Sequence, residues 1–124
     1  MPGSPVTRGF KDETEFNKWL RTRIRRRGYG CVHVREADTP GPLDLVVWWG
    51  TTMVAWIELK LDDRLVEASQ IEFMRGLKKG GTTHCVVRFR HDVERFEVSQ
   101  MNSDYELKEI FSTDNVETLL DSLL

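Results

Sequence analysis

The sequence has little of what marks a secreted, membrane-spanning or zinc-binding protein. Its 124 residues include two cysteines, Cys31 and Cys85, which lie far apart and form no CxxC pair. No apolar run approaches the roughly 20 residues that a membrane span needs, and no signal peptide, internal repeat or low-complexity tract is recognisable. We therefore expect two buried free thiols in a reducing, cytoplasmic compartment, and no membrane partner.

The composition is that of an ordinary globular protein, with 40% hydrophobic and 31% charged residues. A chain of this length has room for one core, so residues 1–124 are expected to form a single domain, with residues 1–9 as a flexible arm. The net charge of −2 conceals a gradient: residues 8–35 hold nine Lys/Arg and three Asp/Glu, a balance of +6. Residues 92–124 hold two and nine, a balance of −7. A basic N-terminal third predicts one surface for a polyanion on an otherwise acidic protein.

Hydrophobic periodicity and turn residues predict the elements along the chain. We expect helices at residues 12–27, 66–79 and 114–124, and strands at residues 30–37, within 41–50, at 53–61, 84–90 and 93–101, with a loop at 38–42. The order α-β-β-β-α-β-β-α predicts an α/β fold with a mixed central sheet of about five strands flanked by helices. Trp48, Trp49 and Trp56 are assigned to the core, with stacking platforms as the alternative, and the three histidines to strands or turns.

Three charged residues are predicted to converge on one hairpin. Side chains alternate along a strand, so Glu58 and Lys60 project from the same face, and a bend at Gly41-Pro42 brings Asp44 to the start of the neighbouring strand. Burying this much charge without a partner costs several kcal/mol. A divalent cation would compensate it. The alternatives are a turn-capping Asp44, an exposed Glu58 on an edge strand and a Glu58–Lys60 salt bridge with no catalytic part.

Two further polar residues are placed near this cluster by helical spacing. Gln70 precedes Phe73 and Leu77 by three and seven positions and so shares their inward face, either as part of the site or satisfied by backbone. At the start of the first helix, Glu13 lies on the stripe that faces the sheet, with Glu15 to the side as the substitute. Either acid could instead only complement the helix N-terminus.

This pattern resembles the PD-(D/E)xK nuclease superfamily, in particular its single-domain VRR-Nuc proteins and the phage and archaeal Holliday junction resolvases. The resemblance spans about residues 12–89 and departs from the usual string in that Leu43 stands between Pro42 and Asp44. It implies a restriction-endonuclease-like core and a bacterial or phage origin. It also implies a Mg²⁺- or Mn²⁺-dependent endonuclease that hydrolyses phosphodiester bonds of DNA, structure-dependent or non-specific, often as a homodimer.

The resemblance also implies a role for each residue. Asp44, Glu58, the backbone carbonyl of Leu59 and, as an outer ligand, Glu13 would hold the metal ion. Lys60 would hold the attacking water or stabilise the phosphorane, and Gln70 would bond to Lys60, to a ligand carboxylate or to the water. The DNA-binding residues are expected to be basic side chains of the two helices, either solvated or bound to phosphate: Arg21, Arg23, Arg25, Arg26, Arg27, Lys78 and Lys79.

Two other functions fit the same residues. A catalytically silent nucleic-acid-binding module on the nuclease fold is the first, and an RNA-processing nuclease is the second. The exposed aromatic residues and the apolar C-terminal helix are candidate dimer contacts.

Overall fold

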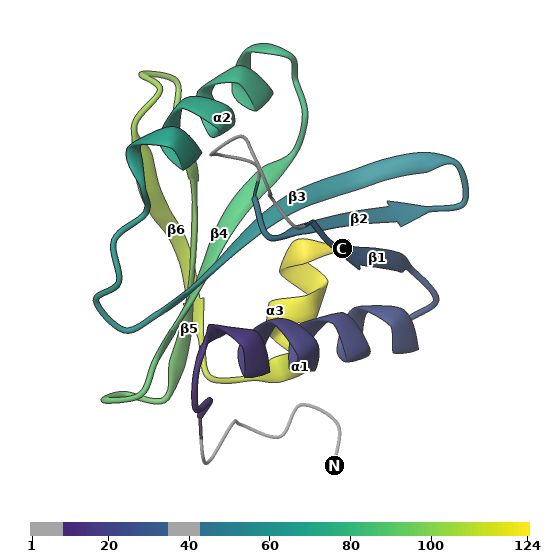
Figure 1. The fold of residues 1–124 in the computed structure, drawn as a ribbon, viewed down its shortest axis with the longest axis vertical. Helices are drawn as coiled ribbons and strands as arrows, with labels where there is room; N and C mark the ends of the chain where they lie inside the picture. The colour runs from purple at the N-terminus through teal and green to yellow at the C-terminus, as the bar shows by residue number, and fades with distance from the viewer. Residues whose placement is uncertain (1–8, 35–42) are drawn as a thin grey trace.

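The computed structural model describes residues 9–34 and 43–124, which form a six-stranded mixed sheet with three helices (Figure 1). The order is α-β-β-β-α-β-β-β-α, so the predicted fold class is confirmed, with one strand more than expected. The elements are α1 (Glu13–Arg26), β1 (Gly30–His33), β2 (Leu45–Trp49), β3 (Thr52–Leu61), α2 (Ala68–Lys79), β4 (His84–Arg90), β5 (Arg95–Met101), β6 (Leu107–Thr113) and α3 (Val116–Leu123).

The strands lie in chain order from β1 to β6, so β1 and β6 are the two edges of the sheet. All neighbours are antiparallel except β3 and β4, which run parallel. A parallel pair needs a crossover connection, and α2 supplies it. The α2 residues belong to a smaller core cluster that is separate from the main cluster of α1 and α3. Helix α2 therefore covers the opposite face of the sheet from α1 and α3 (Figure 1).

Helix α1 forms where the sequence predicts it and starts at a side-chain cap. Asp12 accepts a hydrogen bond from the Glu15 backbone N–H at 2.9 Å, which satisfies one free donor of the first turn. Phe16, Leu20 and Ile24 recur every fourth residue and are fully buried against the sheet. The burial of these three residues fixes the orientation of α1 about its own axis. Glu13, one turn before Phe16, consequently lies near Arg64, which follows the end of β3.

Three expectations need correction. β6 was not predicted, because its pattern of exposure is that of an edge strand with charged residues in its middle. Trp48 and Trp49, assigned to the core, are 38% and 55% exposed, whereas Trp56 is half-buried and packs on Phe73. The apolar face of α3, a candidate dimer contact, is buried in the main core of this chain.

Some expectations fall on residues outside the described ranges. They are most of the predicted N-terminal arm, the end of the first predicted strand at residues 35–37, and the loop at 38–42. In the described part of the chain, the two cysteines are free and buried, as predicted. No helix among these residues is both long and apolar enough to pass through a membrane.

Candidate active site beside β3

The two predicted carboxylates meet where β2 begins. Leu45 of β2 pairs with Ile57 of β3, while β3 continues to Leu61 along β4. Asp44 therefore stands beside the second half of β3, and its Oδ2 accepts a hydrogen bond from the Leu59 backbone N–H at 2.9 Å. In return, the Asp44 backbone N–H donates to Oε1 of Glu58 at 3.1 Å. The register of the hairpin thus brings residues 44 and 58 together, while the bend expected at Gly41-Pro42 lies outside the described residues.

Glu58 is the centre of the polar network. Both it and Lys60 are buried, and Oε2 of Glu58 lies 3.3 Å from the Lys60 ammonium nitrogen. The same oxygen accepts a hydrogen bond at 2.8 Å from Nε2 of Gln70, which α2 carries inward as predicted. Oε1 of Gln70 in turn accepts from the Glu67 backbone N–H at 3.0 Å, within the capping box of α2. The start of α2 therefore fixes the Gln70 amide, and Gln70 helps to fix the Glu58 carboxyl.

This environment changes the protonation of Glu58. Burial, and then the neighbouring Asp44 carboxylate, raise the pKa of Glu58 to about 8, while Lys60 and the hydrogen bonds from Lys60 and Asp44 act in the opposite direction. Glu58 therefore gives up its proton less readily than an ordinary carboxyl group, and a further cation close to it would favour its ionised form. Such a shift at a polar cluster is typical of functional sites.

Glu13 faces a small cavity together with Asp44. The cavity has a volume of about 180 Å³ and is lined by Glu13, Thr14, Asn17, His33 and Asp44. Oε2 of Glu13 is buried without a hydrogen bond to any described residue, and it lies 3.7 Å from Nε of Arg64, a distance too long for one. Glu15 is exposed instead, 3.4 Å from the Lys11 backbone nitrogen. Of the two helical acids, Glu13 is the one that shares a cavity with Asp44.

These residues fit a divalent cation that is held by few protein ligands. Within residues 9–34 and 43–124, no three His, Cys, Asp or Glu side chains are arranged to hold a metal ion together. Mg²⁺, however, is usually bound through one or two carboxylates and keeps several waters. Asp44 and the unsatisfied oxygen of Glu13 can provide them. The Leu59 N–H points to Asp44, so its carbonyl lies on the same edge of β3, where it was predicted as a ligand.

The five arginines of α1 have different surroundings. Arg27 bonds to Glu117 and Asp121 of α3, and these partners raise its pKa. Arg23 lies over the Trp19 ring at 5.4 Å from its centroid. Arg21 bonds to the Asn17 side chain and Arg25 to the Cys31 carbonyl. Arg26 is exposed. The predicted cluster therefore divides into one arginine neutralised within the protein and four whose charge has no acidic partner among the described residues.

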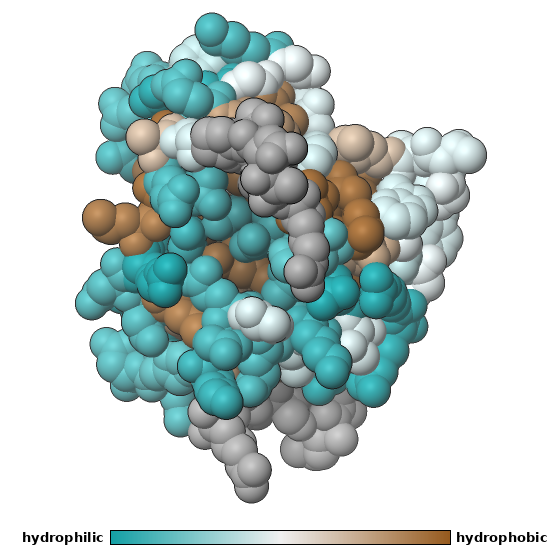
Figure 2. Space-filling view, viewed as in Figure 1, coloured by the Kyte–Doolittle hydropathy of each residue, from teal (hydrophilic) through white to brown (hydrophobic). Residues whose placement is uncertain are grey.

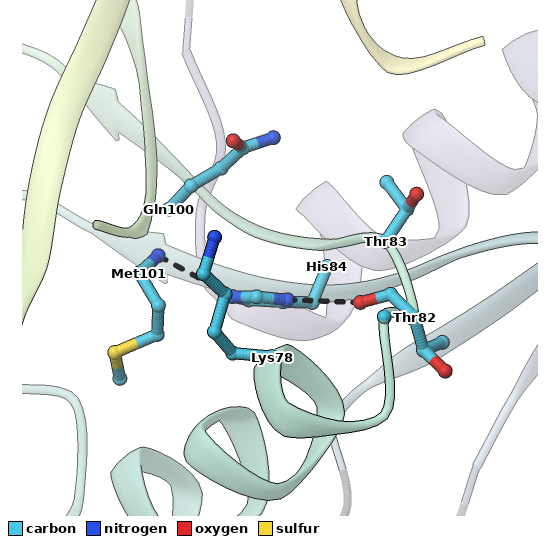
Figure 3. Close-up of a pocket in the computed structure, with 7 residues that line it drawn as sticks. Lys78, Thr82, Thr83, His84, Gln100 and Met101 are labelled. Carbon is cyan, nitrogen blue, oxygen red and sulfur yellow. Dashed lines mark hydrogen bonds between the residues drawn. The ribbon is translucent and has the colours of Figure 1, made fainter. Parts of the chain in front are cut away.

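Lys78 and Lys79 lie at the far end of α2, about 12 Å along the helix axis from Gln70. Lys78 borders a second cavity, of about 220 Å³, which Figure 3 shows together with His84 and Gln100. The buried His84 ring accepts from the Met101 N–H at 3.3 Å, so its other nitrogen carries the proton and donates to the Thr82 carbonyl at 3.2 Å. Both ring nitrogens are thus used in holding the fold, and this histidine has a structural role.

Sequence reasoning missed three residues of the first cavity, Thr14, Asn17 and His33. Asn17 follows Glu13 by four positions, so helical spacing alone places it on the same face. Its Oδ1 accepts from Nε of Arg21 at 2.6 Å. His33 comes from the last residue of β1, which pairs with Leu45 next to Asp44. Residues 35–42 separate β1 from β2 in the sequence, and no local pattern indicated the register in which the two strands pair.

No protein-family model matches the chain, and no curated protein matches its sequence. Among solved structures, the fold matches Hjc, a Holliday junction resolvase from the archaeal hyperthermophile Archaeoglobus fulgidus, with a TM-score of 0.51. The match covers 88% of this chain and 90% of that one, at 19% sequence identity. Hjc has the PD-(D/E)xK nuclease fold, so the resemblance seen in the sequence is confirmed for the fold. At this level of identity the likeness concerns the fold alone.

Proposed function

We propose that the protein is a divalent-cation-dependent nuclease, one domain over residues 1–124, that hydrolyses phosphodiester bonds of DNA. The observation that carries the proposal is the network around Glu58. Asp44, Lys60 and Gln70 come from three separate elements and all bond to one buried carboxyl group. A buried ion pair is seldom the most stabilising choice for a core position. Its presence here, on a nuclease fold, is explained if the charges act on a substrate.

In this proposal each residue has a distinct task. Asp44 and Glu58 would hold Mg²⁺ or Mn²⁺ together with the Leu59 carbonyl, and Glu13, which lines the cavity with Asp44, would be an outer ligand. When bound, the ion polarises the phosphate and lowers the pKa of a coordinated water. Lys60 orients the attacking water or neutralises charge that builds up on the phosphate oxygens. Gln70 keeps the Glu58 carboxyl in place.

The expected substrate is DNA whose structure, not sequence, decides where it is cut. Residues 9–34 and 43–124 form the sheet and helices of this fold and no further helix or strand, so we expect these elements themselves to contact the DNA. Junction, flap or nicked DNA and non-specific duplex cleavage are the candidates, and Hjc is a Holliday junction resolvase. We expect a homodimer to present two sites to two strands. With α3 buried, the dimer contact would have to use other surfaces.

The test is a cleavage panel with wild-type protein and matched variants. Supercoiled plasmid, a four-way junction, a flap, a single strand and an RNA hairpin are each incubated with Mg²⁺, Mn²⁺ or EDTA. We expect metal-dependent cleavage of at least one DNA substrate and its loss in Glu58→Gln and Lys60→Met. Binding without cleavage of any substrate would instead favour the silent binding module. Cleavage of RNA alone would favour the RNA-processing enzyme.

The chain supplies its own controls. Glu106 and Lys108 form a second ion pair, 3.5 Å apart, at the exposed edge of the sheet. Glu106→Gln and Lys108→Met make the same chemical changes at a site with no proposed role. If these variants lost activity as the site variants do, the loss could not be assigned to the site.

A further inference from the structure

We infer that the surface leading from the candidate active site along α1 to the β2–β3 hairpin binds an unpaired nucleic-acid strand. At its far end, an unpaired base stacks on Trp49, beside Tyr29. The inference rests on the proposed function and narrows its substrate to DNA that has unpaired nucleotides near the cleaved bond.

The aromatic end of this surface is unusually exposed. Trp49 is 55% exposed, and its ring centroid lies 4.7 Å from that of Tyr29 at an interplanar angle of 55°. On its inner side, Trp49 packs over Gly28, where an added Cβ would lie 3.4 Å from the ring. The remaining surface of the indole faces solvent. Large aromatic side chains of this kind are a recurrent platform for bases of single-stranded nucleic acids.

The neighbouring Trp48, by contrast, packs tightly against the edge strand β1. Trp48 lies so close over Gly30 that a Cβ there would stand 2.0 Å from the indole. Trp48 and Gly30 are Cα partners across the β1–β2 pair, so this contact holds the edge strand in place. Trp49 projects from the opposite side of β2, and its contacts with Gly28 and Tyr29 are looser and leave more of the residue exposed, 55% against 38%. Its exposure is therefore free for a partner.

A basic row connects the aromatic end to the site. Asn17, Arg21 and Arg25 recur every fourth residue and lie on one side of α1. Asn17 lines the cavity with Glu13 and Asp44 and accepts a bond from Nε of Arg21, while Nε and one terminal nitrogen of Arg25 donate to the Cys31 carbonyl at 3.2 and 2.6 Å. Both guanidinium groups are thereby positioned while further N–H donors remain for a phosphate.

Charge identifies the occupant as a polyanion. Arg21 and Arg25 form no ion pair with a described acidic residue, whereas Arg27, two positions after Arg25, is bonded to both Glu117 and Asp121. The protein has thus neutralised the arginine that faces α3 and left positive those that face the β1 edge. A second copy of this chain could offer the acidic residues of 92–124 to this row, but it would bring no base for Trp49. A nucleic-acid strand brings both the phosphates and a base for Trp49.

The geometry favours an unpaired strand over a continuous duplex. Asn17 and Arg25 are about 12 Å apart along the axis of α1, which corresponds to roughly three to four stacked bases at about 3.4 Å each. Within a duplex, both faces of each base are already covered by neighbouring base pairs. A flap, gap, frayed end or single strand offers a free face. In Figure 2, hydrophilic side chains cover α1, and the paler β2–β3 hairpin projects beyond them. A nucleic-acid strand that runs along α1 would therefore reach the hairpin.

The test is equilibrium binding without cleavage. Full-length protein in EDTA is titrated with a labelled single strand and with a blunt duplex of the same length, by fluorescence anisotropy. We expect Trp49→Ala to weaken single-strand binding by about tenfold and duplex binding by less than about twofold, with recovery in Trp49→Phe. Arg25→Gln should lower the slope of log affinity against log salt for the single strand by about 0.7. The control, Ile110→Ala, changes an equally exposed apolar residue (58%) on the opposite edge.

A direct readout accompanies the titration. A single strand that carries 2-aminopurine should show position-dependent fluorescence quenching by wild-type protein and less quenching by Trp49→Ala. Equal loss of affinity for both substrates, or no loss for either, would overturn the inference. So would a change from dimer to monomer in Trp49→Ala during sedimentation, because the tryptophan would then contact a second copy. If the protein binds single strands through Trp49 but cleaves no substrate, only the nuclease proposal is contradicted. If the protein cleaves DNA but Trp49→Ala binds single strands as tightly as wild type, only this inference is contradicted.

Discussion

The chain contains the tripeptide Glu-Leu-Lys twice, at residues 58–60 and 106–108, and the two copies have opposite surroundings. In both, the carboxylate and ammonium groups form an ion pair, at 3.3 Å in the first and 3.5 Å in the second. The side chains of Lys60 and Glu58 are 6% and 2% exposed, whereas those of Lys108 and Glu106 are both 61% exposed. Identical residues at nearly identical distance therefore carry very different energetic consequences.

Burial explains the difference. An exposed pair such as Glu106–Lys108 gains about 0–1 kcal/mol, because water already solvates both charges well. The buried pair must first give up that solvation, and replacing such pairs with apolar residues is often neutral or stabilising. Stability therefore gives no reason to place Glu58 and Lys60 inside the sheet. A Glu-x-Lys motif in a sequence therefore indicates a candidate active site only where strand pairing buries both side chains. In this chain the buried copy also has the partners Asp44 and Gln70.

The largest expected effect is on catalysis by Lys60. Lys60→Met should lower the cleavage rate by about 10²–10³-fold, because it removes a preorganised charge from the reacting phosphate. Lys108→Met should leave the rate within about twofold of wild type, because substitutions at exposed surface sites usually have small effects. Single-turnover cleavage measures both. The comparison fails if the two variants lose activity alike, or if neither does.

The second prediction concerns pH and the proton on Glu58. Because the folded-state pKa of about 8 lies above the ordinary value of 4.5, the folded protein holds this proton more tightly than the unfolded chain. The stability that this group contributes to the metal-free protein is therefore fully present below about pH 4.5 and lost as the pH rises through about 8. Glu58→Gln should flatten this loss, and Glu106→Gln should not. Thermal unfolding in EDTA from pH 5 to pH 9, as an approximate window around these values, provides the measurement.

Metal ions extend the same prediction. A cation near Asp44 favours the ionised form of Glu58, so Mg²⁺ binding should release a proton at neutral pH. The increase in melting temperature on addition of Mg²⁺ should consequently grow as the pH rises toward 8. A pH-independent increase would mean that the ion binds away from Glu58.

Gln70 should have an intermediate effect. Gln70→Ala removes the 2.8 Å hydrogen bond that orients the Glu58 carboxyl, and loss of such supporting contacts lowers metal affinity or activity about 10–100-fold. Gln100 lines the other cavity at the far end of α2, so Gln100→Ala is its control. The two are compared by the Mg²⁺ concentration that gives half-maximal cleavage. An unchanged concentration in Gln70→Ala would leave this glutamine with only its role in capping α2.

The smallest effects separate the arginines of α1. Arg27→Ala should lower the free energy of unfolding by about 0.5–1 kcal/mol at low salt, because its ion pairs to α3 are partly exposed, and should not weaken DNA binding. Arg25→Ala combined with Arg26→Ala should weaken DNA binding and reduce its salt dependence, and should also lower stability through the lost hydrogen bonds from Arg25 to the Cys31 carbonyl. Chemical denaturation measures the loss of stability in each, and anisotropy distinguishes the two. The reverse outcome would place the DNA on the α3 side of the helix.

The sequence predicts the site better than the edges of the fold, for physical reasons. Local patterns indicated where Asp44, Glu58 and Gln70 would lie: Glu58 from strand alternation, Gln70 from helical spacing to Phe73, and Asp44 from a bend expected at Gly41-Pro42, outside the described residues. β6 was missed because an edge strand buries only part of one face, so Glu109 and Ile110 both remain exposed and the alternating pattern is weak.

Contacts between elements were beyond prediction. The register that places His33 beside Asp44 depends on how β1 pairs with β2, and the ion pairs of Arg27 depend on α3, about ninety residues later in the chain. Trp49 was assigned to the core because aromatic residues usually are. Its exposure depends on where the sheet ends, which no pattern within β2 records.

The most direct measurement is Mg²⁺-dependent cleavage of a labelled four-way junction and a flap substrate by wild-type protein, Lys60→Met and Lys108→Met, each confirmed to be folded. The account predicts that wild type and Lys108→Met cut at similar rates and that Lys60→Met, though folded and able to bind DNA, does not. Equal cleavage by all three proteins would contradict the claim that the buried Glu-Leu-Lys copy exists for catalysis.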